Sequence, residues 1–128
     1  MEPGSDASRV PCIPQGRQGR LTALRVIQSP RAKRDVIDHY TRIGLRNEDA
    51  AEHFLMAVAR AVSRIAERPD IGSTRLWRNP ALRGVRAWPV IGFERYIVYY
   101  RRQTPDSLRI LRLLHGAVLP EGALRTPD

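Results

Sequence analysis

The sequence predicts an α+β domain in which an N-terminal strand and an α-helical hairpin precede a three-stranded antiparallel sheet, in the order β-α-α-β-β-β. Three observations predict this architecture. Two segments with the apolar spacing of helices follow one another closely, the first starting at Pro30 and the second ending before Pro69. Three strand-like runs then follow at 82–90, 93–102 and 107–115. Only short turns separate these runs, and short turns join antiparallel neighbours.

The N-terminal part is predicted to be a strand followed by the first helix. Residues 21–28 alternate as a strand does. Ser29 is a good N-cap, and Pro30 suits the first helical position. Gly44 predicts the end of this helix. Apolar and aromatic residues between these signals form one stripe, at Ala32, Val36, Ile37, Tyr40 and Ile43.

The second helix has an equally clear beginning and end. Asn47 is its predicted N-cap, and Glu48 and Asp49 place negative charge in the first turn, where the helix dipole favours it. Pro69 ends the helix. Because few residues join the two helices, we expect them to pack as an antiparallel hairpin. Its apolar stripe consists of Ala51, Phe54, Leu55, Val58, Ala61, Val62 and Ile65.

The sheet is predicted to have one covered face and one partly open face. Residues 69–81 form a loop, and Ile91-Gly92 and Gln103–Asp106 supply the turns between strands. Two helices can cover only one face of such a sheet. We therefore expect the strand arginines to line the uncovered face. Alternation along the middle strand places Phe93, Arg95, Ile97, Tyr99 and Arg101 on one face and Glu94, Tyr96, Val98, Tyr100 and Arg102 on the other. Both faces mix aromatic and charged residues, so the alternation leaves open which of them is buried.

The charge of the chain predicts an acidic partner. The net charge is +9, and every basic residue except Lys33 is arginine. Arginine presents a planar fork that matches phosphates and carboxylates. Nucleic acid, an anionic membrane surface and an acidic protein segment all fit this charge, and the charge alone does not choose among them.

The ends of the chain are predicted to lie outside the folded domain. Residues 1–20 read as a disordered leader, 21–117 as the domain and 118–128 as an irregular tail. Cys12 is the only cysteine, which excludes an intramolecular disulfide and a cysteine-based zinc site and favours a reducing cytoplasm. No apolar run reaches membrane-spanning length, so we expect no membrane partner.

Motifs for cofactor or metal binding are absent from the sequence, and we expect neither group. It contains no phosphate-binding glycine loop, nucleophile elbow or paired-histidine zinc motif. His39 and His53 lie on predicted helices and are interpreted as packing or surface residues. His115 ends the last strand, where it is either a general acid or base or a side chain that fixes the strand end.

Five segments in a fixed order resemble the ParE/RelE toxin superfamily of type II toxin–antitoxin systems, and ParE most of all. They are RVIQSPRAKRDVIDHYTRIG at 25–44, RPDIG at 68–72, LRGVRAWPV at 82–90, YIVYYR at 96–101 and RILRLLHGA at 109–117. The resemblance implies an antiparallel sheet with a helical hairpin, in agreement with the order derived above. It also implies a plasmid-stabilisation toxin in a hetero-oligomer with a ParD-like antitoxin, whose segment covers the helices and the basic sheet.

The resemblance leaves three functions open. ParE-like members inhibit DNA gyrase by binding, RelE-like members cut mRNA on the ribosome, and some members are inactive antitoxin-binding modules. The absence of lysine from the basic cluster favours the ParE interpretation. The target-binding candidates are Arg83, Arg86, Trp88, Tyr96, Arg101 and His115, and as a ribonuclease the chain would use Arg83, Arg86, Arg101 and His115 in catalysis. The antitoxin-binding candidates are Phe54, Val58, Ile65, Arg95 and Arg112.

Overall fold

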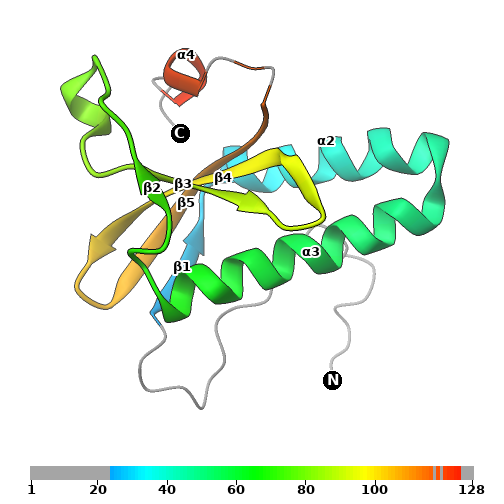
Figure 1. Ribbon diagram of the computed structural model, residues 1–128, viewed down its shortest axis with the longest axis horizontal. Helices are drawn as coiled ribbons and strands as arrows, with labels where there is room; N and C mark the ends of the chain where they lie inside the picture. The colour runs from blue at the N-terminus through cyan, green and yellow to red at the C-terminus, as the bar shows by residue number, and fades with distance from the viewer. Residues whose placement is uncertain (1–23, 117, 119, 125–128) are drawn as a thin grey trace.

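In the computed structural model, which describes residues 24–116, 118 and 120–124, a helical hairpin packs on one face of a mixed sheet (Figure 1). The elements are β1 (Arg25–Gln28), α2 (Pro30–Arg46), α3 (Glu48–Glu67), β2 (Ser73–Thr74), the 3-10 turn η1 (Pro80–Leu82), β3 (Arg86–Val90), β4 (Phe93–Thr104), β5 (Ser107–His115) and α4 (Pro120–Leu124). The five-stranded sheet has the order β1-β5-β4-β3-β2. The predicted α+β class and the strand, hairpin and sheet order are confirmed. The sheet is larger than predicted because β1 joins it parallel to β5 and the two-residue β2 pairs with β3.

The helix ends follow local capping. Ser29 and Asn47 are the predicted N-caps, and their side chains accept hydrogen bonds from the backbone N–H groups of Ala32 and Ala50. The predicted stop at Gly44 is wrong. Helix α2 continues to Arg46 because the Asn47 N–H still donates to the Ile43 carbonyl, at 2.9 Å. Asn47 thus ends α2 and begins α3, and its cap outweighs the roughly 1 kcal/mol cost of a glycine inside a helix.

The buried face of α2 differs from the predicted apolar stripe. Ala32 and Val36 are buried as expected, but their buried companions are Asp35 and His39. Ile37 is exposed instead. A buried carboxylate and imidazole require hydrogen-bonding partners, and the nearest strand of the sheet supplies them.

These partners are backbone groups on the edge of β5. Strand β1 pairs with β5 only as far as Gln28 opposite Ile110, whereas β5 continues to His115. Beyond that point side chains from the start of α2 complete the edge. The Ser29 hydroxyl donates to the Leu111 carbonyl at 2.8 Å, and the Leu113 N–H donates to Asp35 Oδ2 at 3.0 Å. His39 Nε2 lies 2.8 Å from the Leu113 carbonyl oxygen. Helix α2 therefore replaces β1 as the neighbour of β5 beyond Ile110.

Asp35 also holds a charged partner. Arg112 Nε lies 2.7 Å from Asp35 Oδ2, and Arg112 Nη2 donates to Asp35 Oδ1 at 3.0 Å, so the ion pair is bidentate. Arg112 Nη1 donates to the Ala123 carbonyl of α4 at 3.2 Å. The pair is largely shielded from solvent, and it joins α2, β5 and α4.

The main core lies between α3 and the sheet. Its helix residues include Phe54, Val58, Val62 and Ile65, and its sheet residues are Val26, Val90, Val98, Tyr100, Leu108, Ile110 and Leu113. Helix α2 contributes Ala32 and Val36. The predicted stripe of α3 is therefore confirmed as its buried face.

The second face of the sheet is covered in part, in agreement with the expectation of a partly open face. A smaller cluster there consists of Leu82, Val85, Ala87, Tyr99 and Leu114. Trp77, Ala123 and Leu124 pack against it, and Figure 1 shows α4 on the side of the sheet away from α3. The predicted irregular tail over 118–128 is thus wrong at Pro120–Leu124, which form α4. The predicted leader at 1–20 lies outside the described residues.

Two strand details also differ from the prediction. The run predicted from 82 begins as a strand only at Arg86, because Pro80–Leu82 form a 3-10 turn and Gly84 takes a positive φ of 88°. A register shift after Pro89 pairs Val90 with Phe93. Phe93 therefore packs against Phe54, at 5.4 Å between ring centroids, and does not share a face with Ile97 and Tyr99.

The edge contacts of β5 make a prediction about stability. We expect Asp35→Ala to lower the free energy of unfolding by about 3–5 kcal/mol, because it removes the carboxylate that pairs with Arg112 and leaves the Leu113 N–H without its acceptor. Urea unfolding followed by circular dichroism measures this change. Asp38→Ala, an exposed aspartate on the same helix, is the matched control and should change stability by less than about 0.5 kcal/mol. Equal losses in the two variants would show that the Asp35 contacts contribute little.

Candidate functional site

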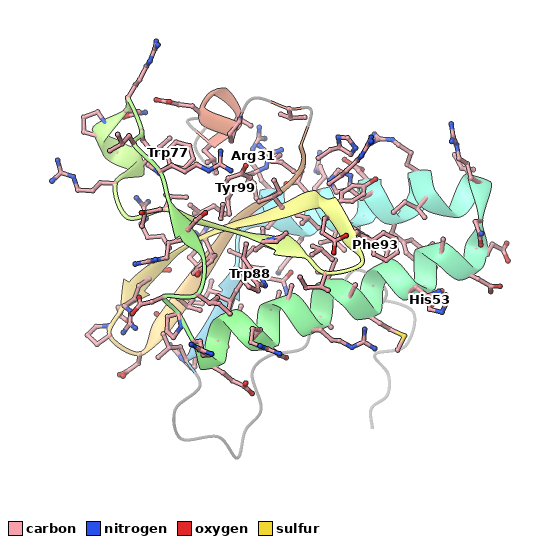
Figure 2. The ribbon with its side chains drawn as sticks, in the orientation of Figure 1. Arg31, His53, Trp77, Trp88, Phe93 and Tyr99 are labelled. Atoms are coloured by element: carbon pink, nitrogen blue, oxygen red, sulfur yellow. The ribbon has the colours of Figure 1, made fainter. Side chains whose placement is uncertain are left out.

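The six target-binding candidates lie in three separate places. Tyr96 and His115 meet where β4 and β5 lie beneath the hairpin. Arg86 and Trp88 lie on β3, on the face covered by α3. Arg83 and Arg101 lie on the second face, near Tyr99 and Trp77. Figure 2 shows Trp88 between the sheet and α3, and Trp77 and Tyr99 on the side of α4.

The Tyr96–His115 pair belongs to an aromatic cluster. The Tyr96 ring lies 5.2 Å from His115, 5.0 Å from Phe54 and 4.8 Å from His39, each measured between centroids and each in edge-to-face contact. Both Tyr96 and His115 are half-buried. The Gly116 N–H donates to the Arg95 carbonyl at 2.6 Å and closes the end of the β4–β5 pair. The position of His115 thus agrees with the interpretation that it fixes the strand end.

His39 is a packing residue with a defined tautomer. A carbonyl oxygen only accepts, so His39 Nε2 carries the proton that is donated to Leu113. Its Nδ1 is buried and has no hydrogen-bond partner among the described residues. Burial lowers the pKa of His39 below 6.5, against the opposing effects of the Leu113 carbonyl and the Asp35 charge. His53, by contrast, is exposed on α3 (Figure 2).

Arg86 supports the loop after α3. Its Nη1 donates to the Gly72 carbonyl at 2.7 Å and to the Asp70 carbonyl at 3.2 Å. The Tyr100 hydroxyl accepts from the Gly72 N–H at 2.9 Å and donates to the Pro69 carbonyl at 2.8 Å. A Cβ at Gly72 would lie 2.6 Å from this hydroxyl, so only glycine fits. The expectation that Arg86 lies on the uncovered face is therefore wrong.

Arg101 has a similar structural task on the other face. Its Nη1 donates to the Ala81 carbonyl at 2.7 Å and to the Arg83 carbonyl at 3.2 Å, which fixes the turn before β3. The Arg83 side chain itself is exposed. Of this pair, Arg83 is the arginine that the fold presents to solvent.

The four ribonuclease candidates do not converge on one point. Tyr96 is paired with His115, and Tyr96 lies five positions before Arg101 on β4, which is about 16 Å along a strand. His115 packs on the helix side, whereas Arg101 lies on the second face. A general acid or base and a phosphate-stabilising cation must reach the same few ångströms of substrate. This arrangement does not bring them together.

Most of the antitoxin-binding candidates are not available to a partner. Phe54, Val58 and Ile65 are at most 2 % exposed, so the expectation that they form a contact surface is wrong. The apolar stripe that suggested a docking face is the face that packs on the sheet. Arg112 is held by Asp35, and Arg95 remains exposed on the surface.

A surface groove on α3 was missed in the sequence. The α3–Trp88 groove has a volume of about 360 Å³ and is lined by Ala57, Arg60, Ala61, Arg64, Trp88 and Ile91. Its alanines and its arginines are each four residues apart on the helix, so small residues alternate with cations along one side. Ile91 is 61 % exposed, and Met56 nearby on α3 is 52 % exposed. These two i, i+4 pairs, one of alanines and one of arginines, are the signal in the sequence that could have predicted this groove.

A second feature missed in the sequence is the loop before η1, where Arg83 shares an open depression with Arg75 and Arg78. No group of His, Cys, Asp and Glu among the described residues could hold a metal ion. Within the same residues, no helix combines the length and apolar character needed to cross a membrane.

The fold and these surfaces define a small, arginine-rich α+β protein whose exposed features suit binding. The sequence profile described as "ParE toxin of type II toxin-antitoxin system, parDE" matches residues 26–120. The chain therefore belongs to the ParE toxin family of type II toxin–antitoxin systems. A solved chain of the chromosomal ParDE TA system from P. aeruginosa has a similar fold, with a TM-score of 0.56 and 17% identity, over 70% of this chain and 92% of that one. No curated protein matches the sequence.

The buried His39 makes stability depend on pH. Because its pKa is lowered by folding, the unfolded chain takes up a proton more readily, so stability is full above 6.5 and falls as the pH drops below it. We expect the melting temperature of His39→Gln to fall less than that of the parent chain when the pH is lowered from about 7.5 to about 5.5. Thermal melts at several pH values measure this. The exposed His53→Gln is the control and should keep the parent's slope, and equal slopes in all three proteins would contradict the assignment.

Proposed function

We propose that this chain is a toxin that inhibits DNA gyrase by binding and is neutralised by a ParD-like antitoxin in the cytoplasm. Membership of the ParE family supports the toxin assignment. The observation that carries the mode of action is that Arg83, Arg86, Arg101 and His115 do not converge. Two of these arginines bond to the protein's own backbone, and His115 packs in an aromatic cluster.

The ribosomal ribonuclease is the alternative that this geometry disfavours. Cleavage of RNA at a 2′-hydroxyl needs a base, a cation on the phosphate and an acid on the leaving oxygen, all around one scissile bond. Inhibition by binding needs only a complementary surface. The exposed arginines of this chain meet that lesser requirement.

The antitoxin is proposed to dock in the α3–Trp88 groove. Ala57 and Ala61 leave room for apolar side chains, and Trp88 and Ile91 line the same space. Arg60 and Arg64 are exposed at its rim. A partner helix with small or aliphatic residues on one side and carboxylates on its flanks matches both features. This proposal replaces Phe54, Val58 and Ile65 with residues at the edge of the buried face of α3, where Ala57 and Ala61 line the groove and Arg60 and Arg64 are exposed.

The gyrase assignment predicts inhibition without turnover. We expect the purified chain to block supercoiling or to accumulate cleaved DNA at amounts comparable to gyrase, since a binding inhibitor acts by occupancy. Purified antitoxin should restore supercoiling. Agarose gels of relaxed plasmid measure both effects. The proposal is wrong if gyrase is untouched by protein that still arrests growth, above all if such protein cuts ribosome-bound mRNA.

The docking groove predicts which arginines the antitoxin uses. Arg60→Gln with Arg64→Gln should weaken antitoxin binding about tenfold at low salt, because two rim cations are lost. Calorimetric titration at two salt concentrations measures the affinity and its salt dependence. Arg42→Gln with Arg46→Gln on α2 is the matched control, with the same exposure, spacing and charge change. Equal weakening by both pairs would indicate a general charge effect and would remove the groove from the interface.

A further inference from the structure

A loop on the opposite side of the sheet from α3 presents an apolar side chain between cations. The Leu76 loop comprises residues 75–79, between β2 and η1. Leu76 is fully exposed, and Arg75 and Arg78 on either side of Trp77 are exposed as well. Together with Arg83 they line an open depression of about 390 Å³. One exposed leucine alone is common on a protein surface, so the case for a contact site rests on its position in an ordered loop between exposed arginines.

The Leu76 loop is held in place by its other residues. Trp77 Nε1 donates to the Val85 carbonyl at 3.3 Å, and the Trp77 ring lies 6.3 Å from Tyr99 (Figure 2). The Asn79 side chain accepts from the Ala81 N–H at 2.9 Å and caps η1. The Asn79 N–H donates to Glu121 of α4 at 2.8 Å. Trp77 and Asn79 thus anchor the loop while Leu76 and Arg78 point away from the core.

The charge around this loop is predominantly positive. Between Asp70 and Glu94 the sequence has no acidic residue and four arginines, namely Arg75, Arg78, Arg83 and Arg86. Arg86 is bonded to the loop after α3, and the Arg75 guanidinium lies 5.6 Å from the Tyr99 ring centre. Glu121, the acidic residue brought in by α4, already accepts a backbone hydrogen bond. The surface around Leu76 therefore complements a negatively charged partner.

We propose that the Leu76 loop, with Arg83, is the surface by which this toxin contacts its protein target, at an apolar pocket rimmed by carboxylates. The proposal rests on the proposed function and names the part of the chain that carries it out. Leu76 would fill the pocket, and Arg78 and Arg83 would pair with the rim. Because Trp77 and Asn79 already order the loop, little conformational entropy is lost on binding.

A protein target fits these residues better than the other candidate partners. Phosphates would satisfy the arginines but would leave Leu76 without a contact. A second copy of this chain would bring together two surfaces of the same positive sign. The α3–Trp88 groove lies on the other face of the sheet, so the two surfaces can be tested separately.

The test compares two exposed leucines in the full-length chain. Leu76→Ser should weaken binding to purified gyrase in the absence of DNA, and its inhibition of supercoiling, by about tenfold or more, since one buried leucine contributes that much. Leu45→Ser, at an 83 % exposed leucine on α2, should leave both unchanged. Arg78→Gln should weaken binding several-fold at low salt and less at high salt, with Arg42→Gln as its control. All four variants should bind the antitoxin as the parent does, which shows that they fold.

Each other result has a defined meaning. Gyrase inhibition that is the same for Leu76→Ser and Leu45→Ser overturns the loop assignment and leaves the proposed function standing. If the parent chain leaves gyrase untouched, the proposed function fails, and growth arrest by the same variants decides the inference. Arrest that survives Leu76→Ser then overturns it. A loss of binding to duplex DNA alone, with gyrase binding intact, would make the loop a DNA contact and would overturn the assignment to a protein target.

Discussion

The whole fold depends on how the backbone of β5 beyond Ile110 finds hydrogen-bonding partners. Strand β1 is too short to pair with β5 beyond Ile110, and buried N–H and C=O groups without partners are costly. Side chains of Ser29, Asp35 and His39 supply those partners from the first turns of α2. This requirement fixes where α2 lies, and the short link at Asn47 then fixes α3 antiparallel to it. The position of the hairpin over one face of the sheet follows from three polar side chains as much as from apolar packing.

The same junction connects the two faces of the sheet. Arg112 is paired with Asp35 on α2 and also donates to the backbone of α4, which packs with the smaller cluster on the second face. Glu121 of α4 in turn bonds to Asn79 before η1. A chain of direct contacts thus runs from α2 through β5 and α4 to the Leu76 loop. The loop is ordered by parts of the chain that lie far from it in sequence.

Much of the fold could be predicted because its signals are local. The Ser29-Pro30 start, the Asn47 cap, the Pro69 stop and the turn at Gly92 depend on residues within one turn of one another. Apart from local errors such as the Gly44 stop, the prediction failed where a residue's role depends on a distant partner. From the sequence alone, Asp35 and His39 are expected to be solvated helix residues, and only their contacts with β5 explain their burial. Ile37 is expected in the core, but it is exposed because the face of α2 that carries Asp35 and His39 is the buried one. Periodicity likewise marked Phe54, Val58 and Ile65 as an apolar face, but it could not say whether the sheet or a partner covers that face.

The arginines show the same limit of prediction from sequence. Their contacts in the structure show which of them are available to a binding partner. In the sequence, Arg83, Arg86, Arg101 and Arg112 are alike, and all were candidates for binding a target or an antitoxin. Their nearest acceptors divide them: Arg86 and Arg101 bond to backbone carbonyls of neighbouring loops, and Arg112 bonds to Asp35. To bind a partner, an arginine that already makes several short hydrogen bonds within its own protein would have to break them. The free energy lost in this way offsets the free energy gained from the new hydrogen bonds. Folding therefore accounts for Arg86, Arg101 and Arg112, and of these four arginines only Arg83, beside the Leu76 loop, is left exposed for recognition.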